Sequence, residues 1–215
     1  MTENVSRKTF WQRATVPMLV LLIVAPMVAA WVMFKYYPDA VRSLGTSNYG
    51  EFVIPVREVN IEGLKDIDSK VMSNKFFKKK WTYVYIQSSE CDVKCLGHLK
   101  LMKNVRLTQG KEIFRLKRLF IISKNAVNDK LRENLKDYPG MQTIVIDMQT
   151  DQGMQLMKSF SFKKNETPQT LASIYVIDPA GMLMMYYKDN KEILKEGKDM
   201  QKDMSKLMRN SQLRK

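Results

Sequence analysis

One uncharged apolar segment near the N-terminus limits the architecture of this chain more than any other feature. Residues 16–34 contain no charged and no strongly polar side chain. A helix of that length covers roughly 28 Å at about 1.5 Å per residue, close to the hydrocarbon thickness of a bilayer. Arg13 precedes the segment, Lys35 follows it, and aromatic rings that favour membrane interfaces lie near both ends, at Trp11, Trp31, Tyr36 and Tyr37. The sequence therefore predicts one transmembrane helix over residues 16–34.

The alternative interpretation of this segment is a cleaved signal peptide. Val28-Ala29-Ala30 would be a tolerable cleavage site, with cleavage after Ala30. The apolar run continues beyond it through the bulky residues 31–34, which is longer than a typical signal core. This length favours an anchor that stays on the chain.

The flanking charges predict an orientation for the anchor. The N-terminal tail carries Arg7, Lys8 and Arg13 against the single acidic residue Glu3. The positive-inside rule then places the tail in the cytoplasm. We expect a single-pass protein of the inner (cytoplasmic) membrane, with its soluble domain in the periplasm.

The remaining chain is long enough for one globular domain. We predict a tail over 1–15, the transmembrane helix over 16–34, a linker over 35–50, one domain over 51–210 and a C-terminal tail over 211–215. The formal net charge is +14, of which the domain carries about +12, so its field attracts an anionic membrane surface or an acidic protein. Nucleic acid is not an expected partner, because the anchor would hold the domain away from it.

The order of elements predicts the fold class. Apolar runs rich in β-branched and aromatic residues indicate strands, and periodic apolar residues indicate helices. The predicted strands cover 52–59, 81–86, 119–122, 173–177 and 182–187, and the apolar run at 143–146 is a strand or a loop. The predicted helices cover 127–135, 151–160, 193–208 and a segment that begins near 91–93. Alternating strands and helices that end in a hairpin and a helix predict an α/β, thioredoxin-like domain, a central mixed sheet flanked by helices.

The only two cysteines, Cys91 and Cys95, directly follow the strand at 81–86. Positions i and i+4 share one face of a helix. If the helix starts near Cys91, its free N–H groups and dipole, together with Lys94, would stabilise a thiolate at Cys91. Such a pair suits thiol–disulfide exchange, and two soft thiolates also suit Cu(I). A purely structural disulfide and two inert cysteines remain as alternatives.

Further ligands for a metal are scarce in this sequence. Zinc would normally need four ligands. His98, the only histidine, lies three residues after Cys95 and is either a surface or helix-flank residue or a third ligand or proton donor. Met182 and Met184 share one face of the terminal hairpin, where core packing is the simpler role and thioether ligation the other.

The anchor, the CxxxC pair after a strand and the hairpin around Asp178-Pro179-Ala180-Gly181 resemble the Sco/SenC family over residues 53–208. These are membrane-anchored thioredoxin-like proteins that assist assembly of the copper centre of cytochrome c oxidase. The stretch from Cys91 to Arg115 more closely resembles a divergent bacterial branch of this family. The residues that carry this likeness are Cys91, Asp92, Cys95, Leu99, Val105, Arg106, Gln109, Gly110, Lys111, Glu112 and Arg115. The family's distal histidine ligand would fall at about Thr170, where this chain has none, and Asp92 replaces a proline common in the family.

The resemblance implies a Sco-like factor for respiratory oxidase assembly that acts through thiol–disulfide exchange, with Cys91 attacking and Cys95 resolving. It implies an oxidase subunit or a copper chaperone as partner. Cys91 and Cys95 are also the implied Cu(I) ligands, with an unknown third ligand. The alternative hypothesis is a non-catalytic membrane-anchored scaffold or docking protein with a structural disulfide.

Overall fold

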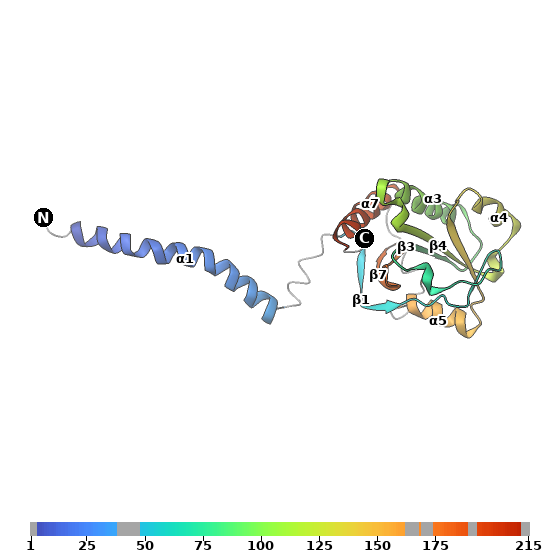
Figure 1. Cartoon of the computed structure of the whole chain (residues 1–215), viewed down its shortest axis with the longest axis horizontal. Coiled ribbons are helices and arrows are strands. Elements are labelled where there is room, and N and C mark those ends of the chain that lie inside the picture. The colour runs from blue at the N-terminus through green and yellow to red at the C-terminus, as the bar shows by residue number, and fades with distance from the viewer. Residues whose placement is uncertain (1–3, 38–47, 162–167, 169–173, 189–192, 212–215) are drawn as a thin grey trace. The chain divides into compact units, whose positions relative to one another are not determined.

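The computed structural model describes residues 4–37, 48–161, 168, 174–188 and 193–211 (Figure 1). The chain divides into two compact units, Met1–Ser47 and Asn48–Lys215.

The first unit is one long helix, α1 (Asn4–Tyr36), which extends beyond the predicted 16–34 on both sides. Within it, the segment Thr15–Tyr36 has a mean hydropathy of 2.4, and no residue of its most apolar part is buried. By length and composition this segment could cross a membrane. At its C-terminal end, the Lys35 ammonium lies 4.7 Å from the centre of the Trp31 ring. This pairing of a cation with an aromatic face suits the membrane–water interface.

The second unit is built on one seven-stranded mixed sheet with the strand order β1-β7-β6-β3-β4-β5-β2. Its strands are β1 (Glu51–Glu58), β2 (Lys65–Asp66), β3 (Trp81–Gln87), β4 (Leu116–Ser123), β5 (Met141–Ile146), β6 (Ile174–Ile177) and β7 (Met182–Tyr187). The three adjacent strands β3, β4 and β5 are parallel, and every other pairing is antiparallel. The mixed sheet confirms the predicted fold class.

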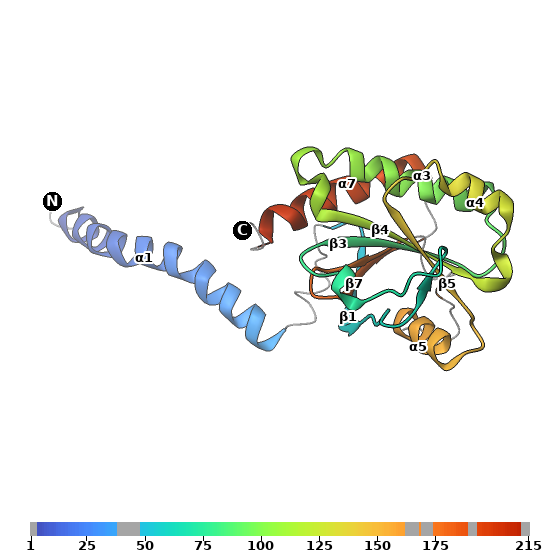
Figure 2. The same ribbon diagram turned by 45° about the vertical axis from the view of Figure 1, so that its right-hand side comes forward.

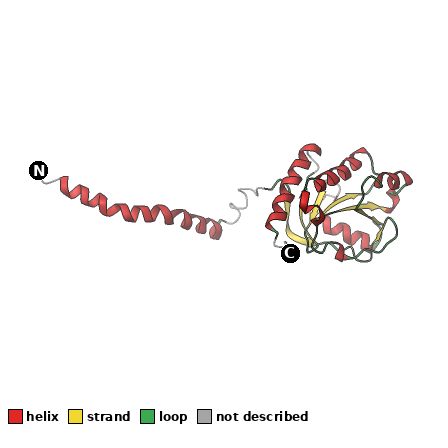
Figure 3. Cartoon of the chain, turned by 45° about the horizontal axis from the view of Figure 1, so that its top comes forward, coloured by secondary structure: helices red, strands yellow, loops and turns green. Residues whose placement is uncertain are grey.

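Helices cover both faces of the sheet (Figures 2 and 3). The α-helices are α3 (Val93–Leu107), α4 (Asp129–Leu135), α5 (Asp151–Phe160) and α7 (Ile193–Asn210), and short 3-10 turns cover Asn74–Phe76, Gly110–Arg115 and Lys124–Ala126. Alternation along β3 separates two cores: Val84 and Ile86 join the cluster under α5, whereas Tyr83 and Tyr85 join the cluster under α3 and α7. Each face is therefore sealed by its own helices.

Most predicted elements are present within one to three residues of their expected bounds. The predicted strand at 173–177 is observed as β6 from Ile174, and Ser173 lies outside the described residues. The short edge strand β2 was not predicted. Its two residues pair with Val145 and Ile144 of β5, a long-range contact that no local pattern encodes.

Candidate functional site

The two cysteines lie where the chain passes from the central strand β3 into α3. The helix begins at Val93, and Asp92 is its N-cap: the Asp92 Oδ1 accepts a hydrogen bond of 2.8 Å from the backbone N–H of Cys95. Aspartate is among the preferred N-cap residues because its side chain satisfies an otherwise unpaired helix N–H. The carboxylate therefore takes one of the N–H groups that a thiolate would otherwise use.

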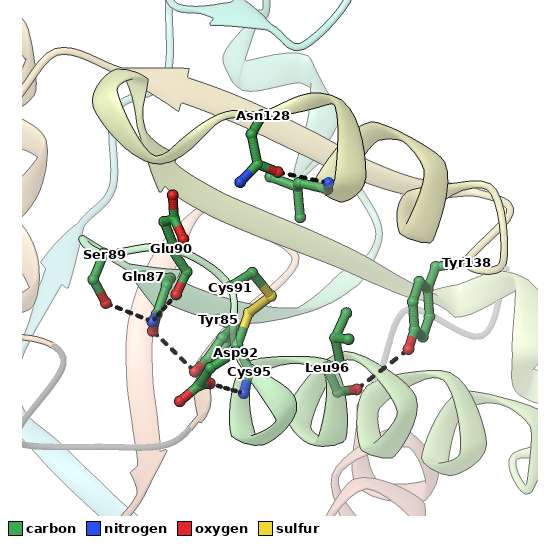
Figure 4. The surroundings of a disulfide bond; sticks show 11 residues. Tyr85, Gln87, Ser89, Glu90, Cys91, Asp92, Cys95, Leu96, Asn128 and Tyr138 are labelled. Atoms are coloured by element: carbon green, nitrogen blue, oxygen red, sulfur yellow. Dashed lines mark hydrogen bonds between the residues drawn. A yellow bond between two sulfur atoms is a disulfide. The ribbon is translucent and has the colours of Figure 1, made fainter.

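Cys91 and Cys95 form a disulfide, and their Cα atoms are 5.2 Å apart (Figure 4). Cys91 precedes the cap, so the two residues do not sit on one helical face, as the i, i+4 spacing suggested. The bond instead joins the loop to the first turn of α3. The helix starts at Val93, within the predicted range, and the chain is extended at Asp92 (φ −83°, ψ −172°), so Cys91 lies just outside the helix. Stabilisation of a Cys91 thiolate by the helix N-terminus stays a prediction.

The two sulfur-bearing residues differ in access to solvent. Cys95 is fully buried against Leu99 and its neighbours, whereas Cys91 is only half-buried. Beside them, Val93 is exposed over 88% of its surface. An attacking group from another molecule would thus reach Cys91 before Cys95.

A hydrogen-bonded chain ties the preceding loop to β3. The Tyr85 hydroxyl donates to the Gln87 Oε1 at 3.1 Å. The Gln87 amide then donates to the Ser89 Oγ at 2.9 Å and to the Glu90 carbonyl at 3.2 Å (Figure 4). Because Glu90 is bonded to Cys91, this chain fixes the backbone that carries the half-buried Cys91. Sequence reasoning missed Gln87, and its only signal was a polar residue at the end of a buried strand.

His98 is not the surface residue that its simpler interpretation implied. Its side chain is 1% exposed and stacks on the Tyr85 ring, with centroids 5.0 Å apart and planes at 20°. Tyr85 in turn stacks on Phe120 of β4 at 5.8 Å. The histidine is thus part of an aromatic stack beneath the first turns of α3.

On the other flank of α3, the Tyr138 hydroxyl donates to the Leu96 carbonyl at 3.3 Å (Figure 4). Burial, with a smaller contribution from the Asp137 charge, raises the pKa of Tyr138. The hydroxyl therefore stays protonated at neutral pH and keeps its role as donor. The contact links the segment after α4 to the first turn of α3.

The methionines of the hairpin lie away from the disulfide. Ile177 pairs with Leu183 and also with Thr82, so the hairpin turn is at the Thr82 end of β3. The cysteines follow the opposite end, at Gln87. Met184 packs against the α3-side core, in keeping with the packing role. The structure therefore does not bring these thioethers to the cysteine pair.

The described residues contain no cluster of three or more His, Cys, Asp or Glu side chains that could hold a metal ion. Thr170, where the Sco family would place its distal histidine, lies outside the described residues. Reduction of the disulfide would leave two thiolates as soft ligands. Among the described residues, the two cysteines fit a two-sulfur site, and no further His, Cys, Asp or Glu side chain joins them in a three-ligand cluster.

Comparison with solved structures shows the same fold in two Sco proteins. Arabidopsis thaliana ScoI, solved with copper bound, has a TM-score of 0.53 and 14% identity, covering 76% of this chain and 99% of that one. Yeast Sco1 with copper bound has a TM-score of 0.51 and 18% identity, covering 78% and 96%. At these identities the likeness shows the fold. A comparison with curated proteins found no match.

A family model covers the chain from the first residue of β3 to the end of α7. It is described as "Transmembrane-like, thioredoxin-like, C-terminal domain" and matches residues 81–211. That range holds the cysteine pair and every strand except the outer pair β1 and β2. This chain belongs to that thioredoxin-like family.

Proposed function

We propose that this protein is a membrane-anchored thiol–disulfide factor that assists assembly of cytochrome c oxidase. The observation that carries the proposal is the Cys91–Cys95 disulfide, placed between β3 and α3 of a thioredoxin-like domain, with Cys91 half-buried and Cys95 buried. Oxidase assembly is suggested by the resemblance to Sco/SenC proteins. Anchoring by α1 in the inner membrane, with the domain in the periplasm, would place the pair beside membrane-embedded oxidase subunits.

The exchange reaction transfers two electrons from this chain to the partner. In the reduced protein, the Cys91 thiolate attacks a disulfide of the partner, forms a mixed disulfide and releases one partner thiolate. The Cys95 thiolate then attacks the Cys91 sulfur, closes the intramolecular bond and releases the second partner thiolate. The partner gains two electrons and this chain loses two, and the released thiolates take up protons from water.

A redox titration of the full chain tests the chemistry. We expect the disulfide to equilibrate with glutathione buffers, as measured by mass-tagged alkylation of the free thiols. A bond that remains oxidised under mild thiol would identify a structural bridge and would contradict the proposal.

A cellular experiment tests the role in oxidase assembly. Cys91→Ser should lower cytochrome c oxidase activity, whereas Ser88→Ala, in the same exposed loop, should leave it unchanged. Intact assembly in a strain with both cysteines replaced by serine would instead favour the non-catalytic scaffold.

The second candidate function is Cu(I) handling by the reduced pair. Two thiolates held on one loop and helix turn can bind Cu(I), which accepts few ligands. We expect anaerobic Cu(I) to bind the reduced full chain in competition with a Cu(I) chelator, and Cys95→Ser to abolish it. Failure to compete with the chelator would remove this candidate, and rescue of Cys91→Ser cells by added copper would favour it.

A further inference from the structure

The outward side of α7 carries only positive charge. Lys195, Lys198, Lys202 and Arg209 are exposed and Lys206 is half-buried. Their spacing of three and four residues places them along one side of the helix, and we call them the α7 cationic stripe. None of the four exposed members takes part in an ion pair among the described residues.

The acidic residues of α7 are buried beside this stripe. Glu196, Asp199 and Asp203 are 1%, 5% and 1% exposed. Asp203 accepts hydrogen bonds from the backbone N–H groups of Tyr49 and Gly50 and from the Tyr187 hydroxyl, so its charge is engaged inside the domain. An amphipathic helix of this composition would normally alternate charges on its outer face. In α7 the three carboxylates are buried instead, so the charged groups left on the outer face are cations.

The stripe borders the point where the linker enters the domain. Lys206 donates to the Asn48 Oδ1 at 3.4 Å, and Lys202 donates to the Tyr49 hydroxyl at 3.3 Å and lies over its ring. The 11 residues between Tyr36 and Asn48 span at most about 40 Å when fully extended. A membrane-inserted α1 would therefore hold the stripe within that reach of the lipid headgroups.

We propose that the α7 cationic stripe docks the domain onto the anionic headgroups of the bilayer that α1 crosses. Each cation near an anionic surface strengthens binding roughly fivefold, and the short tether makes the encounter intramolecular. An acidic protein could also meet such a stripe. Lipid is favoured because the tether is fastened beside the stripe and keeps the bilayer constantly available.

The test uses the full chain in nanodiscs with a fluorescence acceptor in the headgroup layer. Two variants each carry one donor dye. In the first, the dye is attached through Asn210→Cys at the exposed end of α7, and in the second through Gln155→Cys on α5, which covers the opposite face of the sheet. The native cysteines stay in their disulfide in both. With mixed phosphatidylglycerol and phosphatidylcholine, we expect transfer at least twofold higher from position 210 than from 155. The difference should vanish in pure phosphatidylcholine or when salt rises from about 0.05 to 0.5 M.

A quadruple variant with Lys195, Lys198, Lys202 and Arg209 replaced by glutamine should also lose the difference. The matched control replaces four exposed cations near the opposite edge of the sheet by glutamine, Lys65, Lys70, Lys124 and Lys130, and should retain the difference. Circular dichroism checks that each variant folds. Equal transfer from both positions in the unsubstituted protein, or a difference independent of phosphatidylglycerol and salt, would overturn the proposal and leave an acidic protein as the partner to seek.

Discussion

Asp92 sets the electrostatics of the cysteine pair. It is bonded directly to Cys91 in the chain, and its carboxylate caps α3 at the N–H of Cys95. A fixed negative charge there opposes formation of a second negative charge on a thiol. The residue thus stabilises the helix and, in the reduced protein, disfavours the reactive thiolate.

Replacing Asp92 by asparagine should separate these two effects. Asparagine is an equally good N-cap but carries no charge. Repulsion between two unit charges about 5–8 Å apart in water is about 0.5–0.8 kcal/mol, so reduced Asp92→Asn should react about two- to fourfold faster with iodoacetamide at pH 7. The measurement is the rate of Cys91 alkylation in the reduced full chain.

Asp151→Asn provides the control, because it removes an exposed acid from the start of α5 on the other face of the sheet. Its alkylation rate should equal that of the unsubstituted protein. A faster rate in both variants would assign the effect to net charge instead of to the cap.

At the scale of the elements, two glycines show how closely the helices approach their neighbours. A Cβ at Gly153 of α5 would clash with the backbone carbonyl oxygen of Asp147. A Cβ at Gly197 of α7 would lie 2.7 Å from Leu101 Cδ1, the flexible end of a side chain on α3. Backbone cannot move away without displacing its strand or loop, whereas a leucine methyl can.

The change in the free energy of unfolding should therefore differ, in sign or in size, between Gly153→Ala and Gly197→Ala. Alanine gains up to about 1 kcal/mol of helix propensity at either site. At Gly153 overpacking against backbone costs more, about 1–3 kcal/mol, and the variant should be less stable. Gly197→Ala should be close to neutral.

Urea unfolding monitored by near-ultraviolet circular dichroism measures the free energy of unfolding of both variants. Equal stability of the two variants would show that the loop at Asp147 yields as readily as a side chain.

At the scale of the whole domain, buried phenols connect the sheet to α7. The Tyr83 hydroxyl donates to the Met200 carbonyl and the Tyr187 hydroxyl to Asp203, which also holds the N–H groups of Tyr49 and Gly50. Burial, with a smaller contribution from Asp203, raises the pKa of Tyr83. Burial, followed by Tyr83 and Asp203, raises the pKa of Tyr187.

These shifts predict a loss of stability in alkali. Since the folded pKa lies above the unfolded value, the unfolded chain releases protons first, and the stabilisation is complete below about pH 10 and falls as pH rises above it. The free energy of unfolding should be constant up to about pH 10 and decrease above it, as measured by urea denaturation.

Tyr187→Phe should reduce this slope and should also lower stability at neutral pH, because it removes a hydrogen bond to a buried carboxylate. Tyr37→Phe is the control, since Tyr37 is 60% exposed. An unchanged slope in Tyr187→Phe would show that other groups govern the alkaline transition.

The sequence alone determined the candidate membrane segment, the order of strands and helices, and the position of Cys91 and Cys95 after the first central strand. These are local properties, because the length of an apolar run and the period of apolar residues, two in strands and 3.6 in helices, depend only on residues close together in the chain. The fold class followed from that order, and the likeness to Sco structures agrees with it.

Only the tertiary structure decided how these pieces meet. Burial of His98 against Tyr85, the link from Gln87 to the Cys91 loop and the separation of Met182 from the cysteines all depend on strand register and helix placement. So does the burial of Glu196, Asp199 and Asp203, which leaves the α7 stripe cationic. Register and helix placement are fixed by contacts between residues far apart in the chain, and these carry no signal in the local pattern.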